Sequence, residues 1–476
     1  MKTRFVHLLF FLLIFTIASG QEKWDLRRCV EYALQNNISV RQADVQAKIM
    51  TLTYDQSKLS QFPSVNFQNS AGYQFGRSID PSTNQFTNQE ILAANHSLNV
   101  NMDLFNWFSK RNSINANRLQ AEAYTAGIEK AKNDVALNVA NAYLQILLSN
   151  EQIKVSEVQV QQSAEQLNNV KKRVDAGALP ELSQAEMEAQ LANDSSNLIT
   201  AQSNYTLSVL ILKSVLNIPA DTSFVVDIPP VDKIPVESLA DLDPAAVYAL
   251  AEKNMPQQKI NDLNLLAAQK NAAAAKGIMY PSLTFFSGLD SRYSNAQKLL
   301  GTGFAATTVP IGFVDVGGTN YTVRSPAVLP TGYTKNTYFT QLGNNFSQSF
   351  GLGLSVPIFN GGSARTNWNK AKLNAVSVGL QKQSDALTLK QDIYQAHANA
   401  VAAMQKFNAA KKSVDTNEKA YGFALKRFEV GLLNSIDLIT GQNNLFRAKI
   451  NMLSAQYDYV FKMKLLEFYR GQGLRL

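Results

Sequence analysis

The sequence has few of the residues from which catalytic and metal sites are built. Among its 476 residues there is one cysteine, Cys29, and there are three histidines. A single cysteine excludes an intrachain disulfide and a thiolate metal cluster. His96 and His397 stand apart among Asn, Ser and Ala residues, and we interpret both as ordinary polar positions. No glycine-rich phosphate loop, serine-nucleophile elbow or His-Glu-x-x-His motif is present. The sequence therefore predicts no enzyme activity, no cofactor and no metal site.

Long apolar runs are equally scarce. The one long run, residues 5–17, follows a basic start and precedes Ala18-Ser19-Gly20, which is the pattern of a signal peptide over residues 1–20. No later run approaches the length of about 20 residues that a membrane-spanning helix needs. The formal net charge of +8 is small for a chain of this length, so we expect no binding of nucleic acid.

Proline and glycine are almost absent from two long stretches. Residues 108–172 and 364–426 contain no proline, and the glycines within them are Gly127, Gly379 and Gly422. At about 1.5 Å per residue, helices of this length would reach on the order of 100 Å. The sequence therefore predicts two rod-like helices, each far longer than the three turns or so of an ordinary globular helix.

The chain consists of two copies of one unit. Gly177 and Gly431 lie in matching segments at an offset of 431 − 177 = 254 residues, and Pro63 matches Pro281 at an offset of 281 − 63 = 218 residues. The offsets differ because the second copy has a longer insert. Internal duplication of this kind defines the architecture. We expect a signal peptide at residues 1–20, a first repeat at 21–216, a proline-rich connector at 217–243 and a second repeat at 244–476.

Each repeat is predicted to contain a tight helical hairpin. Arg173 with Gly177, and Arg427 with Gly431, mark the ends of the rods, because cations and glycine favour a helix C-terminus. In the last helix, apolar residues recur at intervals of seven, which predicts coiled-coil packing against neighbours on both sides. This pattern favours the wall of an α-helical barrel. An elongated coiled-coil bundle with a filled core is the alternative.

Four segments change to a period of two, with one apolar and one polar face. They lie at about residues 63–75, 97–105, 281–290 and 346–358, and aromatic residues cluster at their ends, as at a membrane interface. Such strands are typical of a transmembrane β-barrel. Four strands cannot close a barrel, and an open edge is intolerable in lipid, so several chains must share one. Eight strands from two chains would leave a filled interior, whereas twelve from three chains would leave a lumen.

A strand-to-helix turn and the two hairpin turns together resemble the TolC-like outer-membrane efflux proteins. The strand-to-helix turn contains Phe359, Asn360, Gly361, Gly362 and Arg365, and each hairpin turn has the pattern Arg-x-x-x-Gly. The resemblance covers essentially residues 24–474. It implies a mainly α fold with a β-barrel portion, in which a homotrimer forms a twelve-stranded barrel in the outer membrane and a twelve-helix tunnel in the periplasm. It also implies two partners, a periplasmic adaptor and an inner-membrane pump of RND, ABC or MFS type.

The resemblance further implies where a periplasmic aperture would lie. In this family the hairpin turns line the opening, and acidic residues narrow it. Asp437 is the matching acidic residue here, and Ser183 is its counterpart in the first repeat. Thr440, Phe428 and Leu433 stand where some members have Asp, Tyr and Arg, so the acidic ring is expected to be thinner. The alternative for Asp437 is a carboxylate that simply caps its own helix.

An outer-membrane channel of a tripartite efflux or type I secretion system explains both the rods and the strands. Such a channel would be a passive duct for small molecules or exported protein. A passive porin would need the barrel but not the rods, and an exported coiled-coil scaffold would need the rods but not the strands. We therefore expect the lipid bilayer of the outer membrane to surround the strands, with the helices in the periplasm.

Overall fold

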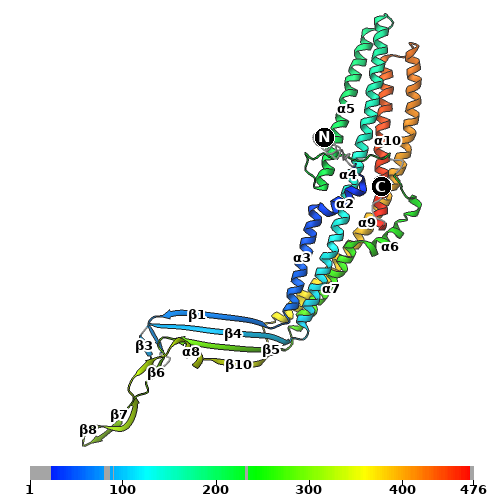
Figure 1. The fold of residues 1–476 in the computed structure, drawn as a ribbon. Helices are drawn as coiled ribbons and strands as arrows, with labels where there is room; N and C mark the ends of the chain where they lie inside the picture. Colours follow the sequence, from blue (N-terminus) through cyan, green and yellow to red (C-terminus); the bar gives the residue numbers. More distant parts are fainter. Residues whose placement is uncertain (1–22, 80–85, 89, 231–233, 472–476) are drawn as a thin grey trace, which may run out of the picture. The chain divides into compact units, whose positions relative to one another are not determined.

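A computed structural model describes residues 23–79, 86–88, 90–230 and 234–471. The predicted signal peptide, residues 1–20, lies outside the described residues. The chain divides into two compact units built from discontinuous segments. Unit 2 comprises Tyr54–Asn115 and Lys270–Lys372, and unit 1 contains the rest. Unit 1 is helical, whereas unit 2 holds the strands and the helix ends that connect to them (Figure 1).

Equivalent helices of the two repeats have the same lengths, which are 11, 22, 67 and 36 residues in chain order. The pairs are α2 (Leu26–Asn36) with α6 (Pro244–Asn254), α3 (Ile38–Leu59) with α7 (Pro256–Gly277), α4 (Ser109–Asp175) with α9 (Ser363–Glu429), and α5 (Glu181–Leu216) with α10 (Ser435–Arg470). The first two pairs keep the offset of 218 residues and the last two the offset of 254. Among the described residues, no helix combines the length and the apolar character needed to cross a membrane.

The core of unit 1 is built from side chains of both repeats. In one cluster Tyr143, Ile146 and Leu212 are fully buried, with Tyr457 of α10 against them. The connector is held on this core, because the Tyr143 hydroxyl donates a hydrogen bond to the carbonyl oxygen of Asp227 at 2.6 Å. Cys29 is fully buried in the same cluster, and this burial raises the pKa of its thiol to about 12. The lone cysteine is therefore a packing residue and not a reactive thiol.

Unit 2 contains an antiparallel sheet with the strand order β1-β4-β5-β10, seen side by side in Figure 1. Its register places apolar residues opposite one another, as where Val65 faces Val100 and Leu98 faces Leu289. Asn99 lies between Asn66 and Gly288 on the opposite face. The period-two alternation of the sequence thus becomes one apolar face and one polar face. The strands are β1 (Ser64–Gln74), β4 (Ile91–Phe105), β5 (Ser282–Ser294) and β10 (Ser347–Ser355).

Three of these strands differ from their expected bounds. β4 begins at Ile91 and not near residue 97, and β5 continues to Ser294 beyond residue 290. The two strands are longer because they pair with each other along almost their whole lengths. β10 ends at Ser355 and not at residue 358. Pro357 has no backbone N–H to donate to a ladder, which accounts for the earlier end.

The segments between the sheet strands contain smaller hairpins. The longest pairs β7 with β8 through the two-residue turn Gly317-Gly318, whose φ angles are +63° and +83°. Positive φ at both positions is the geometry of the tight turn that matches strand twist. The elements in these segments are β2 (Arg77–Ile79), β3 (Phe86–Asn88), β6 (Lys298–Leu300), β7 (Phe304–Val316), β8 (Thr319–Pro330), β9 (Tyr333–Lys335) and α8 (Tyr338–Asn344).

Candidate functional site

Both helical hairpins turn through the same backbone motif. Gly177 and Gly431 have φ angles of +74° and +75°, a left-handed conformation that glycine adopts without a Cβ clash. The next residue in each turn donates its N–H to an arginine carbonyl oxygen, from Ala178 to Arg173 at 2.7 Å and from Leu432 to Arg427 at 2.8 Å. These are Schellman motifs, which satisfy the last carbonyl groups of α4 and α9. The Arg-x-x-x-Gly pattern therefore encodes a turn that requires its glycine.

Asp437 lies in the exposed first turn of α10, beside the second hairpin turn. Its backbone N–H donates to Asn434 Oδ1 at 2.8 Å, so Asn434 is the N-cap of the helix. In the part of the chain that the structure describes, the Asp437 carboxylate has no hydrogen-bond or ion-pair partner. One turn later Thr440 is also exposed, and its hydroxyl donates to the Ile436 carbonyl oxygen at 2.8 Å. These two side chains remain available at the surface of the chain.

Three other residues assigned to the aperture pack between the two hairpins. Ser183 is buried and accepts a hydrogen bond from the Ser435 hydroxyl at 3.2 Å. Phe428 is 6% exposed and packs in a cluster with Leu438, and Leu433 lies half-buried at the edge of that cluster. Their burial within one chain gives these side chains a packing role between the hairpins.

Arg173 links the two hairpin turns. Its guanidinium donates to the Phe428 carbonyl oxygen at 3.1 Å and lies 5.4 Å from the centre of the Phe428 ring. Arg427, the matching residue of the second repeat, is exposed, and its guanidinium donates to the Leu432 carbonyl oxygen of its own hairpin at 3.5 Å. The duplicated arginines therefore have different partners, and this difference could not be derived from the repeat alone.

A buried polar cluster lies further along the same hairpins. Asp194 is 1% exposed and accepts hydrogen bonds from Ser163 at 2.5 Å, Gln190 at 2.9 Å and Gln159 at 3.3 Å. Gln442 of the other hairpin donates to the Ser163 hydroxyl at 2.7 Å. This cluster was not predicted from the sequence, although polar residues 159, 163 and 166 recur at core spacing in α4. Buried polar groups of this kind can fix the register between helices.

The strand-to-helix turn predicted at residues 359–365 connects β10 to α9. Gly361 and Gly362 have φ angles of +64° and +76°, and the Ser363 N–H closes the turn onto the Asn360 carbonyl oxygen at 3.3 Å. Phe359 is 87% exposed, and Arg365 is exposed in the first turn of α9. The glycines thus permit a sharp change from strand to helix.

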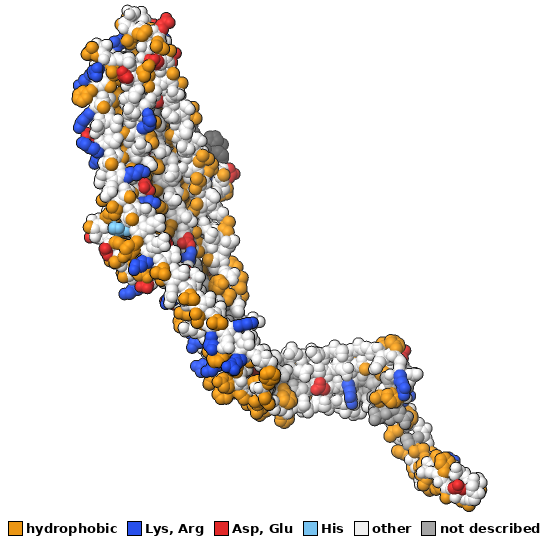
Figure 2. Space-filling model, turned by 180° about the vertical axis from the view of Figure 1, so that it is seen from behind, with side chains coloured by type: hydrophobic (Ala, Val, Ile, Leu, Met, Phe, Trp, Pro, Cys, Tyr) orange, Lys and Arg blue, Asp and Glu red, His pale blue; other side chains and the backbone are white. Residues whose placement is uncertain are grey.

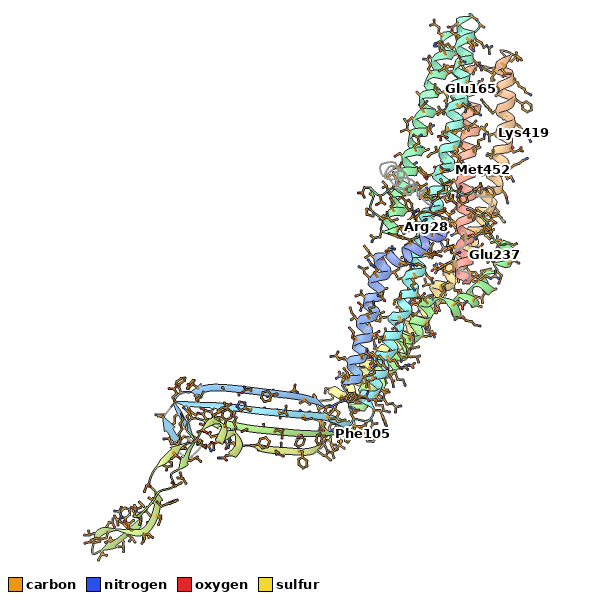
Figure 3. The ribbon with its side chains drawn as sticks, viewed as in Figure 1. Arg28, Phe105, Glu165, Glu237, Lys419 and Met452 are labelled. Atoms are coloured by element: carbon orange, nitrogen blue, oxygen red, sulfur yellow. The ribbon has the colours of Figure 1, made fainter. Side chains whose placement is uncertain are left out.

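The equivalent turn of the first repeat has aromatic residues in place of the glycines. Trp107 and Phe108 adopt φ angles of +49° and +60°. This conformation costs a residue with a Cβ roughly 1–2 kcal/mol. The centre of the Trp107 ring lies 5.5 Å from the centre of the Phe105 ring and 5.0 Å from that of the Tyr280 ring. Phe105 is labelled in Figure 3. Aromatic side chains therefore gather at this end of the sheet. Within the described ranges, no three His, Cys, Asp or Glu side chains form a group that could hold a metal ion.

Comparison with known proteins gives consistent matches along both repeats. The sequence matches the family described as "Outer membrane efflux protein" over residues 29–217 and 247–469. "Outer membrane protein TolC" of Vibrio cholerae is 22% identical over 462 residues, which cover 94% of this chain and 91% of that protein. "Toxin and drug export protein A" of Aggregatibacter actinomycetemcomitans is 21% identical over 435 residues, covering 91% of this chain and 83% of that protein.

Solved structures show the same fold. A crystal structure of CusC superposes with a TM-score of 0.75 at 15% identity, covering 94% of this chain and 92% of that one. The structure of VceC, the outer membrane protein from Vibrio cholerae, superposes with a TM-score of 0.74 at 15% identity, covering 94% of this chain and 97% of that one. The expected fold, long helical hairpins with a four-stranded sheet, is confirmed by these matches and by the strand order.

Proposed function

Because the chain belongs to the outer membrane efflux protein family, we propose that three copies assemble into one export duct. The protein is located in the outer membrane and acts in efflux or secretion, as its relatives do. The four-stranded sheet supports the trimer. β1 and β10 form its two edges and have no neighbouring strand among the described residues. Exposed strand edges leave backbone groups unpaired, which is costly in lipid, and twelve strands from three chains would close a barrel with a lumen.

The helices support a tunnel that continues this barrel. Each chain contributes α4, α5, α9 and α10, and three chains would supply twelve helices extending into the periplasm. Large apolar side chains remain exposed on these helices in the single chain, among them Leu373, Leu380, Leu387 and Leu210. Contact with neighbouring copies would bury such side chains, which is a favourable term in assembly. A filled coiled-coil scaffold would leave the amphipathic sheet without a role.

The duct requires partners that supply energy and cargo. The sequence contains no phosphate-binding loop, so we assign the energy source to an inner-membrane pump of RND, ABC or MFS type, joined through a periplasmic adaptor. The relatives include "Solvent efflux pump outer membrane protein SrpC" of Pseudomonas putida as well as the toxin and drug export protein. These names support small molecules or exported protein as cargo, including multidrug efflux in a Gram-negative cell.

We place the periplasmic aperture at the hairpin turns. Asp437 and Thr440 are the exposed candidates, and three copies of the Asp437 carboxylate would form an acidic ring. Ser183, Phe428 and Leu433 would act indirectly, by holding the hairpins together behind that ring. Arg173 would fix the distance between the two turns through its contact with Phe428.

Deletion and complementation in the native host test the duct. We expect deletion of the gene to sensitise cells to a pump substrate, or to block secretion, when the partnered pump is present and to have no effect when that pump is already absent. The intact gene should restore export. If transport by every candidate pump continues undiminished in the deletion strain, the proposed duct is wrong.

A further inference from the structure

Three of the four helix ends next to the sheet in unit 2 carry only positive charges, and the fourth, the end of α3, holds the ion pair Asp55–Lys58. Residues 105–115, 270–281 and 355–372 contain no Asp or Glu. Lys110 in these segments is paired with Asp103 at 2.8 Å. The remaining cations are exposed and have no ion-pair partner among the described residues. We call them the basic surface, and they are Arg111, Lys270, Lys276, Arg365, Lys370 and Lys372.

The basic surface is continuous across neighbouring helices. The Ser109 hydroxyl of α4 donates to the Ala274 carbonyl oxygen of α7 at 2.8 Å. Lys276 of α7 and Lys372 of α9 both lie over the Trp368 ring, at 5.7 Å and 3.9 Å from its centre. The cations lie within about 14 Å of the ends of their helices, at 1.5 Å per residue. Figure 2 shows Lys and Arg side chains gathered at this helical end of unit 2.

An exposed aromatic and aliphatic band lies between the basic surface and the sheet. Phe105, Trp107 and Phe108 are 41%, 44% and 55% exposed. Ile358 and Phe359 are 94% and 87% exposed. Figure 2 shows this band as hydrophobic side chains beside the positively charged ones. The order along unit 2 is therefore an amphipathic sheet, then aromatic side chains, then cations.

The backbone of the aromatic band is strained. Trp107 and Phe108 occupy the left-handed conformation that the second repeat assigns to Gly361 and Gly362. Glycine at these two positions would relieve that strain, so the aromatic side chains are retained against a conformational cost. Ring contacts within the chain cover only part of them, because about half of each side chain stays exposed. Their retention is consistent with contact to something outside the chain.

We propose that the basic surface and the aromatic band together bind anionic phospholipid headgroups of the periplasmic leaflet of the outer membrane. The inference rests on the outer-membrane location of the sheet. Aromatic rings favour the boundary between acyl chains and headgroups, and Lys and Arg extend beyond it toward phosphate. Each cation that lies within about a Debye length of an anionic membrane surface adds to the free energy of membrane binding. The surface therefore selects anionic over zwitterionic lipid and fixes the depth of the sheet in the membrane.

Quenching of tryptophan fluorescence by brominated lipid tests this proposal. Trp107 lies in the aromatic band, and Trp368 lies beneath Lys372 of the basic surface. Trp24, in contrast, packs against Tyr32 and Phe224 of unit 1. The purified protein is reconstituted in phosphatidylcholine vesicles containing brominated phosphatidylglycerol or, at the same mole fraction, brominated phosphatidylcholine. We expect the anionic lipid to quench at least about twofold more strongly, and the excess to shrink at high salt.

A triple variant identifies the residues responsible. Arg365→Gln with Lys370→Gln and Lys372→Gln should abolish most of the excess quenching by the anionic lipid. The matched control replaces three exposed cations near the hairpin turns, Lys171→Gln, Lys172→Gln and Lys426→Gln, and should keep the excess.

Two results would overturn the proposal. Equal quenching of the wild type by both lipids would show that the cations do not select anionic lipid, and would favour an acidic protein as their partner. The membrane location of the sheet would still hold. Absence of quenching by either lipid would overturn the membrane location of the sheet as well.

Discussion

At the scale of single residues, Asp437 owes its position to its helix and not to a partner. Asn434 caps α10 through the Asp437 backbone N–H, which leaves the Asp437 carboxylate exposed. Leu433, four residues earlier in the chain, supplies no cation next to it. Three such carboxylates near one axis would repel one another and attract cations, and a small aperture would strengthen both effects.

We therefore predict that the channel in planar bilayers is cation-selective and that divalent cations on the periplasmic side reduce its conductance. Asp437→Ala should weaken this block by removing the ligand charge, with little loss of assembly. Single-channel conductance measured against divalent concentration, for the wild type and the variant, gives the comparison.

Asn434→Ala is the matched control, because it removes the helix cap and keeps the charge. It should cost about 0.5–2 kcal/mol of helix stability and leave the divalent block intact. If Asp437→Ala and the wild type gave identical block curves, the carboxylate would act only on the N-terminal dipole of α10, and the aperture would lie elsewhere.

The buried Asp194 predicts an effect on stability. Asp194→Ala would leave the donors on Ser163, Gln159 and Gln190 without their acceptor. An unsatisfied buried group costs about 1–3 kcal/mol, so thermal unfolding of the purified protein, followed by its helical circular dichroism, should shift to lower temperature. Asp415→Ala removes an exposed carboxylate of α9 and should have little effect. Equal shifts for the two variants would contradict the structural role of Asp194.

At the scale of elements, the duplication predicted the helices well. Scarcity of proline and glycine, together with the turn glycines, located α4 and α9 to within a few residues of their observed bounds. The offset predicts which residues are equivalent, but it does not predict which residues touch. Arg173 and Arg427 are equivalent, yet Arg173 donates a hydrogen bond to the other hairpin, whereas Arg427 donates one within its own hairpin. Such contacts depend on packing between helices that are distant in sequence, so the roles of Ser183 and Phe428 emerged only from the fold.

Two glycines near the end of α9 are predicted to respond to alanine substitution with opposite changes in stability. Gly431→Ala should destabilise the hairpin by about 1 kcal/mol, because its φ is +75° although nothing lies within 4 Å of the added Cβ. Gly422→Ala, inside α9 and equally open, should stabilise it by about 0.5–1 kcal/mol. Thermal unfolding of the two single variants provides the measurement. Shifts of the same sign would show that space, and not backbone conformation, governs these positions.

Local sequence patterns predicted the faces of the strands but not their bounds or the turn that follows β4. The alternation predicted the apolar and polar faces, whereas the early start of β4 depends on its partners, because Ile91 and Leu92 pair with the end of β1 and residues from Ala93 onward pair with both β1 and β5. The left-handed Trp107 and Phe108 could not be expected from propensity, since aromatic residues rarely adopt that conformation. Local rules fail most clearly at this turn, which is also where the membrane contact is proposed.

At the scale of the whole molecule, a single chain leaves strand edges and large apolar side chains exposed. The sheet ends in two edge strands, and large apolar side chains remain exposed on strands and helices, including Phe350, Leu352 and Leu373. Lipid can cover one face of the sheet, but strand edges require hydrogen-bonding partners. In the proposed trimer, other copies of the same chain would supply the matching strands without any further component.

The stoichiometry of the purified protein tests this account most directly. Native mass spectrometry of the detergent-extracted outer-membrane protein measures the number of chains without assuming a shape. We predict a complex of three mature chains that heating separates into monomers, because in the proposed barrel β1 of one chain would pair with β10 of the next. A monodisperse monomer that does not fractionate with the membrane would contradict the shared barrel and, with it, the export duct.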